Sequence, residues 1–212
     1  MRTLIFDLDG TLSDPIIGIS RSINHALTSS GYRPRAQSEL AQYVGPPLDE
    51  TFKVLTNASD AEIRNLVSLY RDRYAEVGFS ENTIYPGIDS ALSVLSKRGV
   101  RLGICTSKRE DFAEKILRMF EIRDHFSFVS GGDIGVTKRQ QIARLLIDGT
   151  ISSRALMIGD RAVDVLAAQE NGIGSVGVLW GYGSRTELAD QSPLCLLEGA
   201  DELIDLPDLR PD

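Results

Sequence analysis

The chain has 212 residues, a length that fits one core domain with a modest insertion and excludes long repeat arrays and large multidomain assemblies. With 42% hydrophobic and 25% charged residues, it has the composition of a folded globular protein rather than a disordered one. The formal net charge of −7 leaves no broad basic surface for nucleic acid or anionic lipid, so we expect neither as a partner.

The N-terminus and the cysteines indicate the cellular compartment. The run Leu4-Ile5-Phe6 is too short for a signal peptide, and no later run approaches the length of a membrane span. Cys105 and Cys195 form neither a disulfide framework nor a zinc pattern. We therefore expect a cytoplasmic protein without membrane attachment, either a monomer or a small homo-oligomer.

In chain order, short apolar strands are separated first by a long helical stretch and then by single helical patterns. The predicted strands are Thr3–Phe6, Val100–Cys105, Phe126–Val129, Ala155–Ile158 and Ser175–Leu179. The acidic tail after Ser192 predicts a last short strand and helix with a frayed end. This alternation is typical of an α/β fold, a doubly wound, Rossmann-like parallel sheet with helices on both faces.

The stretch from residue 15 to 82 differs, because it holds no convincing strand and three helical patterns. The first apolar stripe ends at Gly31, and the third begins at a capping box formed by Ser59 and Glu62. The sequence therefore predicts a small all-helical domain inserted into the core. The expected domains are a core of residues 1–14 and 83–212 and an insertion of residues 15–82.

Acidic and hydroxyl side chains directly follow the first strand, in Asp7-Leu8-Asp9-Gly10-Thr11. Taken alone, this segment could equally be an acidic turn. Three further strands are followed by polar groups, in Thr106-Ser107-Lys108, Gly132-Asp133 and Gly159-Asp160. Because the carboxyl ends of parallel strands meet at one edge of a sheet, we expect these groups to converge there.

The residue types at this edge indicate a metal and a phosphate. Asp7, Asp9, Asp160 and Asp164 would repel one another without a cation, and oxygen ligands without His or Cys favour Mg²⁺ over zinc. Lys138 opens a predicted helix, and an ammonium group with nearby hydroxyls and amides suits phosphate oxygens. No serine or cysteine is evidently paired with histidine, so a carboxylate is the natural nucleophile.

The order of these motifs resembles that of the haloacid dehalogenase-like hydrolase superfamily. Its four motifs are similar to Asp7-x-Asp9-x-Thr11, Thr106, Lys138 and Gly159-Asp160-x-x-x-Asp164, over nearly the whole chain. With an aspartate at position 9 in the first motif, the chain resembles the phosphatase branch of the superfamily. The insertion is similar to the cap of phosphoglycolate phosphatase-like members. Short segments along the chain resemble a 5′-nucleotidase-like subgroup. These segments are Val44–Leu48, Tyr85–Gly87, Thr106–Lys108, Gly159–Arg161 and Gly181–Gly183.

The resemblance assigns roles to the acidic residues. It implies that Asp7 attacks phosphorus to form an aspartyl-phosphate while also binding Mg²⁺. Asp9 would be the general acid and then the general base, with its backbone carbonyl facing the metal. Asp160 would be a metal ligand, and Asp164 would reach the metal through water or hold Lys138.

The same resemblance implies that Thr106 and Lys138 bind the phosphoryl oxygens and that Thr11, at the phosphate site, orients Asp9. Ser107, which also lies just past the strand, is a further candidate for a hydroxyl contact to phosphate. Lys138 lacks the proline that commonly follows it in the family, so Arg139 is a rival for the catalytic cation.

We expect the inserted helices to select the substrate, because the core motifs handle only the phosphoryl group. Gly45 lies in a Gly-Pro-Pro loop that resembles the specificity loop of the family, with a plain interhelix turn as the alternative. Arg21 is a candidate substrate ligand or a solvated surface charge. Lys108 is a candidate for a substrate carboxylate or second phosphate, or another surface charge. Trp180 and Tyr182 either stack on a base or pack in a loop.

Together these observations predict a Mg²⁺-dependent phosphatase for a small phosphorylated metabolite or nucleotide, with phosphoglycolate or a nucleoside 5′-monophosphate as the expected substrate. The alternatives are a sugar phosphomutase on the same core and a non-catalytic regulator that binds a nucleotide or a partner. A dehalogenase is disfavoured, because displacement at carbon gives Asp9 no leaving oxygen to protonate.

Overall fold

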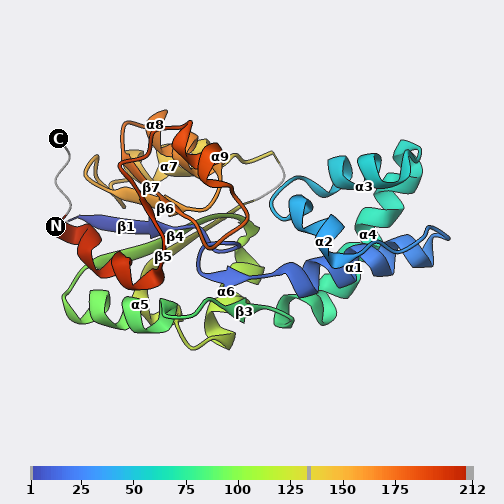
Figure 1. Cartoon of the computed structure of the whole chain (residues 1–212), viewed down its shortest axis with the longest axis horizontal. Helices are drawn as coiled ribbons and strands as arrows, with labels where there is room; N and C mark the ends of the chain where they lie inside the picture. The colour runs from blue at the N-terminus through green and yellow to red at the C-terminus, as the bar shows by residue number, and fades with distance from the viewer. Residues whose placement is uncertain (1, 133–134, 209–212) are drawn as a thin grey trace. The chain divides into compact units, whose positions relative to one another are not determined.

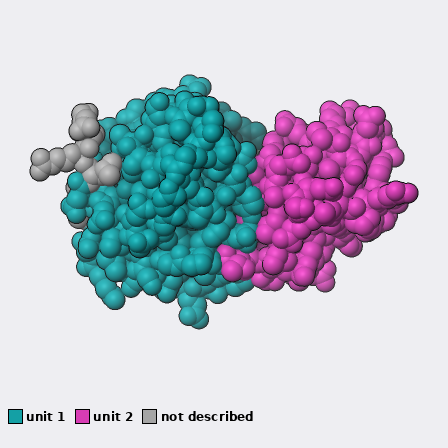
Figure 2. All heavy atoms as spheres, in the orientation of Figure 1, with its two compact units in different colours: residues 1–14, 84–212 teal, residues 15–83 magenta. Residues whose placement is uncertain are grey.

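The computed structural model describes residues 2–132 and 135–208, so Asp133 and the end of the acidic tail lie outside the described residues. The chain forms two compact units, a core unit of residues 1–14 and 84–212 and a helical unit of residues 15–83 (Figure 2). Across the described ranges, every helix is too short or too polar to cross a membrane.

The core unit is built on a parallel sheet, with strand order β5-β4-β1-β6-β7-β8. Successive strands are added on one side of β1 as far as β5, and the chain then crosses to add β6, β7 and β8 on the other side. This is a doubly wound sheet, and it confirms the predicted fold class. The strands are β1 (Thr3–Phe6), β4 (Arg101–Arg109), β5 (Phe126–Gly132), β6 (Leu156–Gly159), β7 (Gly174–Val178) and β8 (Cys195–Leu197).

The central strand β1 is apolar from Leu4 to Phe6, as expected for a strand with helices on both faces of the sheet. Leu4, Ile5 and Phe6 have no exposed surface. On one face, Ile5 belongs to a cluster that includes residues of α7 (Lys138–Ile147) and α8 (Ala162–Gln169). Helices α5 (Ile88–Lys97) and α6 (Glu110–Met119) cover the other face (Figure 1).

Several elements of the core unit differ from the sequence prediction. Strand β4 continues past Cys105 to Arg109, and its pairing with β5 is irregular between those two residues. The predicted tail strand is β8, but the last element is the 3₁₀ helix η4 (Ala200–Asp208), which contains Pro207. Proline cannot donate a backbone hydrogen bond, so it does not support a regular α-helix there. Short elements that were not predicted are β2 (Ser13–Asp14), β3 (Thr83–Ile84), η3 (Arg123–His125) and α9 (Arg185–Ala189).

The helical unit contains the three predicted helices, which are α1 (Ile16–Ser29), α3 (Leu48–Thr56) and α4 (Asp60–Glu76). The Ser59 backbone amide donates to Glu62 at 3.0 Å, and the Ser59 hydroxyl accepts from the Glu62 amide at 3.4 Å, so α4 begins at the predicted capping box. Helix α1 packs along α4 and α3 packs on α4. The short elements α2 (Gln37–Leu40), η1 (Ala41–Tyr43) and η2 (Gly78–Ser80) complete the unit.

Candidate active site

The candidate site lies at the carboxyl ends of β1 and β6, the neighbouring strands at which the strand order reverses. Asp7 directly follows β1, and its backbone amide donates to the Ile158 carbonyl of β6 at 2.9 Å. Asp160 directly follows β6. In open parallel sheets such a switch point leaves a crevice in which ligands bind.

Three carboxylates meet at this point. Asp7, Asp160 and Asp164 are buried, and each offers a carboxylate oxygen that lies within 4.8 Å of the others. Asp164 lies in the first turn of α8, and its Oδ2 accepts from the Arg161 amide at 3.1 Å. Burial, reinforced by the charges of Asp164 and Asp7, raises the pKa of Asp160 to about 7.

Lys138 supplies positive charge to the cluster. Its Nζ lies 3.0 Å from Asp7 Oδ2, it also pairs with Asp164 Oδ1, and its side chain is 1% exposed. Burial disfavours the ammonium form, but the two carboxylates outweigh it and raise the pKa of Lys138 above its usual value. Arg139, in contrast, pairs with Glu170 at 3.4 Å with a side chain that is 64% exposed. The structure thus brings Lys138, and not Arg139, to the carboxylates.

A second ion pair joins Asp9 and Lys108. Lys108 Nζ lies 2.7 Å from Asp9 Oδ2, and both side chains are largely buried. Burial raises the pKa of Asp9, although Lys108 acts in the opposite direction. The Asp9 carboxylate is not among the three acids that meet at the site. The Lys108 ammonium contacts an acid of the site, where a substrate ligand or a surface charge was expected.

Two carboxylate oxygens in the site are buried and have no hydrogen-bond partner among the described residues. They are Oδ1 of Asp7 and Oδ1 of Asp9. Buried polar atoms are rarely left unpaired in folded proteins, so an unpaired carboxylate oxygen within an acidic group indicates a missing positively charged or electrophilic partner. The all-oxygen donor set of Asp7, Asp160 and Asp164 fits a hard divalent cation.

Both oxygens of Asp160 are held by neighbouring loops. Thr11 Oγ1 donates to Asp160 Oδ1 at 3.1 Å, whereas the sequence analysis expected Thr11 to orient Asp9 at the phosphate site. The Tyr182 amide donates to Asp160 Oδ2 at 2.8 Å. Gly10 has φ +85°, and a Cβ there would lie 2.2 Å from Asp160 Oδ2, so only glycine lets the first loop approach this carboxylate.

The loop at residues 180–182 is hydrogen-bonded to the segment that follows β1. Trp180 Nε1 donates to the Thr11 carbonyl at 2.9 Å, and the Tyr182 hydroxyl donates to Asp14 Oδ1. These contacts agree with the packing alternative for both residues. The sequence analysis did not predict that the Tyr182 amide binds Asp160, because a backbone donor leaves no side-chain pattern. The glycines on either side of Tyr182 were a signal that could have pointed to it.

The remaining core candidates lie in the last part of β4. The side chain of Thr106 is buried, and its Oγ1 accepts from the Lys108 amide at 3.2 Å. Ser107 is exposed. A further residue that the sequence analysis did not single out, Gln141 of α7, donates from Nε2 to the Thr106 carbonyl at 3.1 Å.

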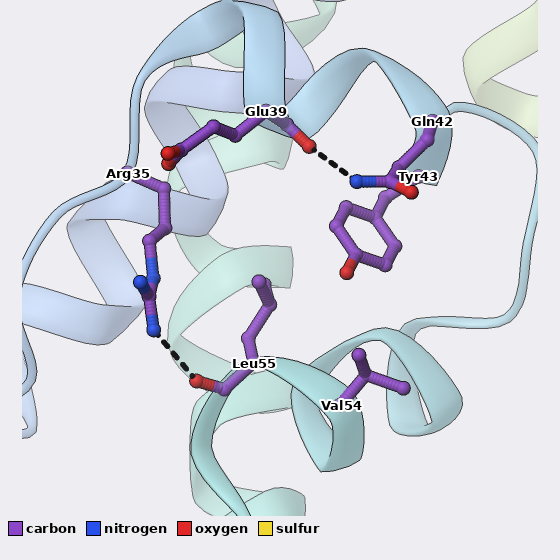
Figure 3. Close-up of a pocket in the computed structure, with 6 residues that line it drawn as sticks. All are labelled: Arg35, Glu39, Gln42, Tyr43, Val54 and Leu55. Carbon is purple, nitrogen blue, oxygen red and sulfur yellow. Dashed lines mark hydrogen bonds between the residues drawn. The ribbon is translucent and has the colours of Figure 1, made fainter.

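The helical unit contains the two predicted specificity residues. Arg21 pairs with Glu81 at 2.6 Å and remains 62% exposed, and Gly45 has φ +104° in an exposed loop. Neither lines the pocket of about 320 Å³ in this unit, in which Arg35 donates to the Leu55 carbonyl at 3.3 Å (Figure 3). That pocket is lined by Arg35, Glu39, Gln42, Tyr43, Val54 and Leu55.

Comparisons with known proteins identify the family. The haloacid dehalogenase-like hydrolase family model matches residues 4–178. A Pseudomonas aeruginosa protein named 5′-nucleotidase is 37% identical over 90% of this chain and 88% of its own length. A Mycobacterium tuberculosis protein named tyrosine-protein kinase PtkA is also 37% identical, over 90% of this chain and 66% of its own length.

More distant and structural relatives agree with the family. A phosphoglycolate phosphatase of Pseudomonas fluorescens is 28% identical over 96% of this chain and 78% of its own length. The crystal structure of a predicted phosphatase from Clostridium acetobutylicum is 33% identical, with a TM-score of 0.89 over 98% of this chain and 99% of that one. These findings confirm the predicted family and enzyme class, a phosphoric monoester hydrolase. The chain belongs to the haloacid dehalogenase-like hydrolase family.

Proposed function

We propose that the chain is a Mg²⁺-dependent phosphatase that hydrolyses small phosphomonoesters through an aspartyl-phosphate on Asp7. The observation that carries the proposal is the unpaired, buried Oδ1 of Asp7, whose other oxygen lies 3.0 Å from the Lys138 ammonium. A carboxylate with one oxygen neutralised and the other free is suited to nucleophilic attack on phosphorus. The relatives named phosphatase and nucleotidase support the same chemistry.

We assign the metal to Asp7, Asp160 and Asp164, together with the backbone carbonyl of Asp9. When bound, Mg²⁺ supplies positive charge that offsets the negative charge of the phosphoryl oxygens facing Asp7. Thr11 and the Tyr182 amide hold Asp160 in place for this role. Lys138 links the nucleophile to Asp164, so a single ammonium balances two carboxylates of the site.

In the first half-reaction, an Asp7 carboxylate oxygen attacks phosphorus and the bond from phosphorus to the ester oxygen breaks. Asp9 donates its proton to the departing oxygen, which leaves as an alcohol. The raised pKa of Asp9 agrees with a group that must carry this proton. Lys138, the Thr106 hydroxyl and the Ser107 hydroxyl bind the phosphoryl oxygens.

In the second half-reaction, Asp9 accepts a proton from water as that water attacks phosphorus. The bond between phosphorus and the Asp7 oxygen breaks, which releases inorganic phosphate and restores both carboxyl groups to their starting states. Lys108, 2.7 Å from Asp9, holds the acid that acts in both steps.

We assign substrate selection to the helical unit, acting as a cap domain, with Gly45 and Arg21 as the residues that contact the part of the substrate beyond phosphate. Phosphoglycolate and nucleoside 5′-monophosphates are the candidate substrates, because relatives bear both names.

A second candidate function is transfer of phosphate to a protein tyrosine, and it is favoured by the relative named tyrosine-protein kinase. That protein is longer, and this chain spans 66% of it. Incubation with ATP labelled at the γ-phosphate separates the two functions. A kinase yields labelled phosphotyrosine on a protein substrate, whereas a phosphatase specific for phosphomonoesters yields none.

The experiment that tests the main proposal is a hydrolysis screen over about a hundred phosphorylated metabolites, with Mg²⁺ and with a chelator. We expect phosphate release that requires Mg²⁺ and disappears in Asp7→Asn. A hexose 1-phosphate in the screen also tests the mutase alternative, because a mutase isomerises it without releasing phosphate. Turnover that survives in Asp7→Asn would rule out the aspartyl-phosphate mechanism.

A further inference from the structure

Gln141 joins the helix that contributes Lys138 to the strand that contributes Thr106. It lies on α7, three residues after Lys138, so the two side chains project from the same side of the helix. The residue is buried, with 4% of its surface exposed. A buried amide must satisfy its polar atoms within the protein, and Gln141 does so at the ends of two neighbouring strands.

The hydrogen bonds of Gln141 fix the orientation of its amide. Nε2 donates to the Thr106 carbonyl of β4 at 3.1 Å, and Oε1 accepts from the Ser130 hydroxyl of β5 at 3.0 Å. The Cys105 thiol also approaches Oε1, at 3.6 Å. Because the Thr106 carbonyl can only accept a hydrogen bond, Nε2 of Gln141 must face it. In the opposite orientation of the amide, Oε1 would face the Thr106 carbonyl, and two acceptors would meet.

The Thr106 carbonyl lies where β4 loses its regular pairing with β5. Cys105 is in register with Ser130, but the next register pair joins Arg109 to Gly132, so Thr106, Ser107 and Lys108 fall in a bulge opposite Gly131 alone. A bulge leaves residues without regular ladder partners and re-aims their side chains. The contact from Gln141 is made at the first residue of this bulge.

We propose that Gln141 is a positioning residue that holds the Thr106 end of β4 in register with Lys138 and thereby sets the affinity of the site for the phosphoryl group. The inference rests on the proposed function, since it takes Thr106 and Lys138 as phosphate ligands. Gln141 does not touch the phosphate. It acts through the backbone of the bulge and is independent of the carboxylates assigned to Mg²⁺.

The test measures binding of inorganic phosphate and of Mg²⁺ to the full chain and its variants by calorimetry. Gln141→Met keeps the length of the side chain and removes both polar contacts. Gln141→Glu keeps an acceptor for Ser130 but, as a carboxylate, cannot donate to Thr106. For both we expect phosphate affinity to fall by about five- to tenfold at saturating Mg²⁺, with Mg²⁺ affinity within about twofold of the unsubstituted chain.

Ser130→Ala is the matched control, because it removes the other partner of the amide and leaves the bond to Thr106. We expect its phosphate affinity to stay within about twofold of the unsubstituted chain. Hydrogen exchange adds a readout without ligand, in which residues 106–108 exchange faster in Gln141→Met than in Ser130→Ala.

Unchanged phosphate affinity and exchange in Gln141→Met and Gln141→Glu would overturn the inference, as would a parallel loss of Mg²⁺ affinity or an equal loss in Ser130→Ala. If one variant does not fold, the other decides. The unsubstituted chain separates this failure from that of the proposed function. A chain that binds no phosphate and hydrolyses no ester refutes the function, whereas an active chain whose phosphate affinity is the same with and without the substitution refutes only the role of Gln141.

Discussion

The Lys138 ammonium lies 3.0 Å from Asp7 Oδ2 and is shared with Asp164, so one buried cation stabilises a carboxylate at the end of β1 and another in the first turn of α8. Its position follows from the start of α7 at Lys138, directly after the Thr137 N-cap, which aims the first side chain of the helix into the site. The next residue, Arg139, lies on the exposed side of the same helix.

Replacing these two neighbouring residues tests that assignment. We expect Lys138→Met to lower kcat/KM by about 10²- to 10³-fold, because the charge facing the phosphoryl group is lost. It also leaves two buried carboxylates without their partner, which lowers the free energy of unfolding by about 3–5 kcal/mol. Arg139→Met, with an exposed side chain, should change neither quantity appreciably. Steady-state kinetics and urea unfolding provide both measurements, and a larger effect at Arg139 would reverse the assignment.

Asp7→Asn tests the nucleophile. An amide keeps the shape of the side chain but is a poor nucleophile, so we expect hydrolysis of an aryl phosphate to fall by more than about 10⁴-fold. Circular dichroism should report the native fold. Rapid quenching followed by mass spectrometry should find a phosphorylated peptide containing Asp7 in the unsubstituted chain and none in the variant. A phosphorylated peptide that does not contain Asp7 would assign the nucleophile to another residue.

Under the proposed metal assignment, Mg²⁺ should stabilise the fold, because it would relieve repulsion among the buried acids of the folded chain. We expect the unfolding midpoint to rise with Mg²⁺ concentration in the unsubstituted chain. Asp160→Asn should remove most of that rise, whereas Asp124→Asn, an exposed acid outside the cluster, should keep it. Thermal unfolding with Mg²⁺ or with a chelator is the measurement. Equal shifts in the two variants would place the cation elsewhere.

Tyr182→Phe separates the contribution of the Tyr182 hydroxyl from that of its backbone amide. The substitution removes the hydroxyl that donates to Asp14 but leaves the backbone amide that donates to Asp160. We expect the free energy of unfolding to fall by about 1.5–3 kcal/mol, the contribution of a hydrogen bond to a charged group. Mg²⁺ affinity, measured by calorimetry, should stay unchanged. A large loss of Mg²⁺ affinity would show that the hydroxyl, and not the main chain, supports Asp160.

Cys105 should be unreactive in the folded chain. Burial raises the pKa of its thiol to about 12, so the reactive thiolate is scarce at pH 8. Titration with a thiol reagent at pH 8 should therefore modify the partly exposed Cys195 first and both cysteines only in denaturant. Rapid modification of Cys105 in the native protein would indicate that the end of β4 opens to solvent.

Much of the fold could be predicted because burial leaves a periodic record in the sequence. Apolar runs marked the strands, and the capping box at Ser59 marked the start of α4. The short strands β2 and β3 were not predicted, since two residues carry no periodicity. The bulge in β4 was also missed, because its register depends on β5, a partner distant in sequence.

The grouping of Asp7, Asp160 and Lys138 could be predicted from residue types that follow strands or open a helix, whereas the partners of these residues could not. Thr11 was expected to serve Asp9 and donates to Asp160, and Lys108 was expected to meet substrate and pairs with Asp9. Such choices depend on rotamers and on loops that fold back from distant parts of the chain. The supporting contributions of Gln141 and the Tyr182 amide likewise exist only once the sheet has formed.

The Tyr85 amide donates to the Leu12 carbonyl at 3.0 Å, which joins the two segments of the core unit on either side of the inserted helices. The two core segments are therefore bonded directly to each other, and not only linked through the inserted residues. Under the proposed assignment of substrate selection to the helical unit, exchanging residues 15–83 for the corresponding segment of a relative should transfer the substrate preference of that relative and leave the chemistry of the core unchanged.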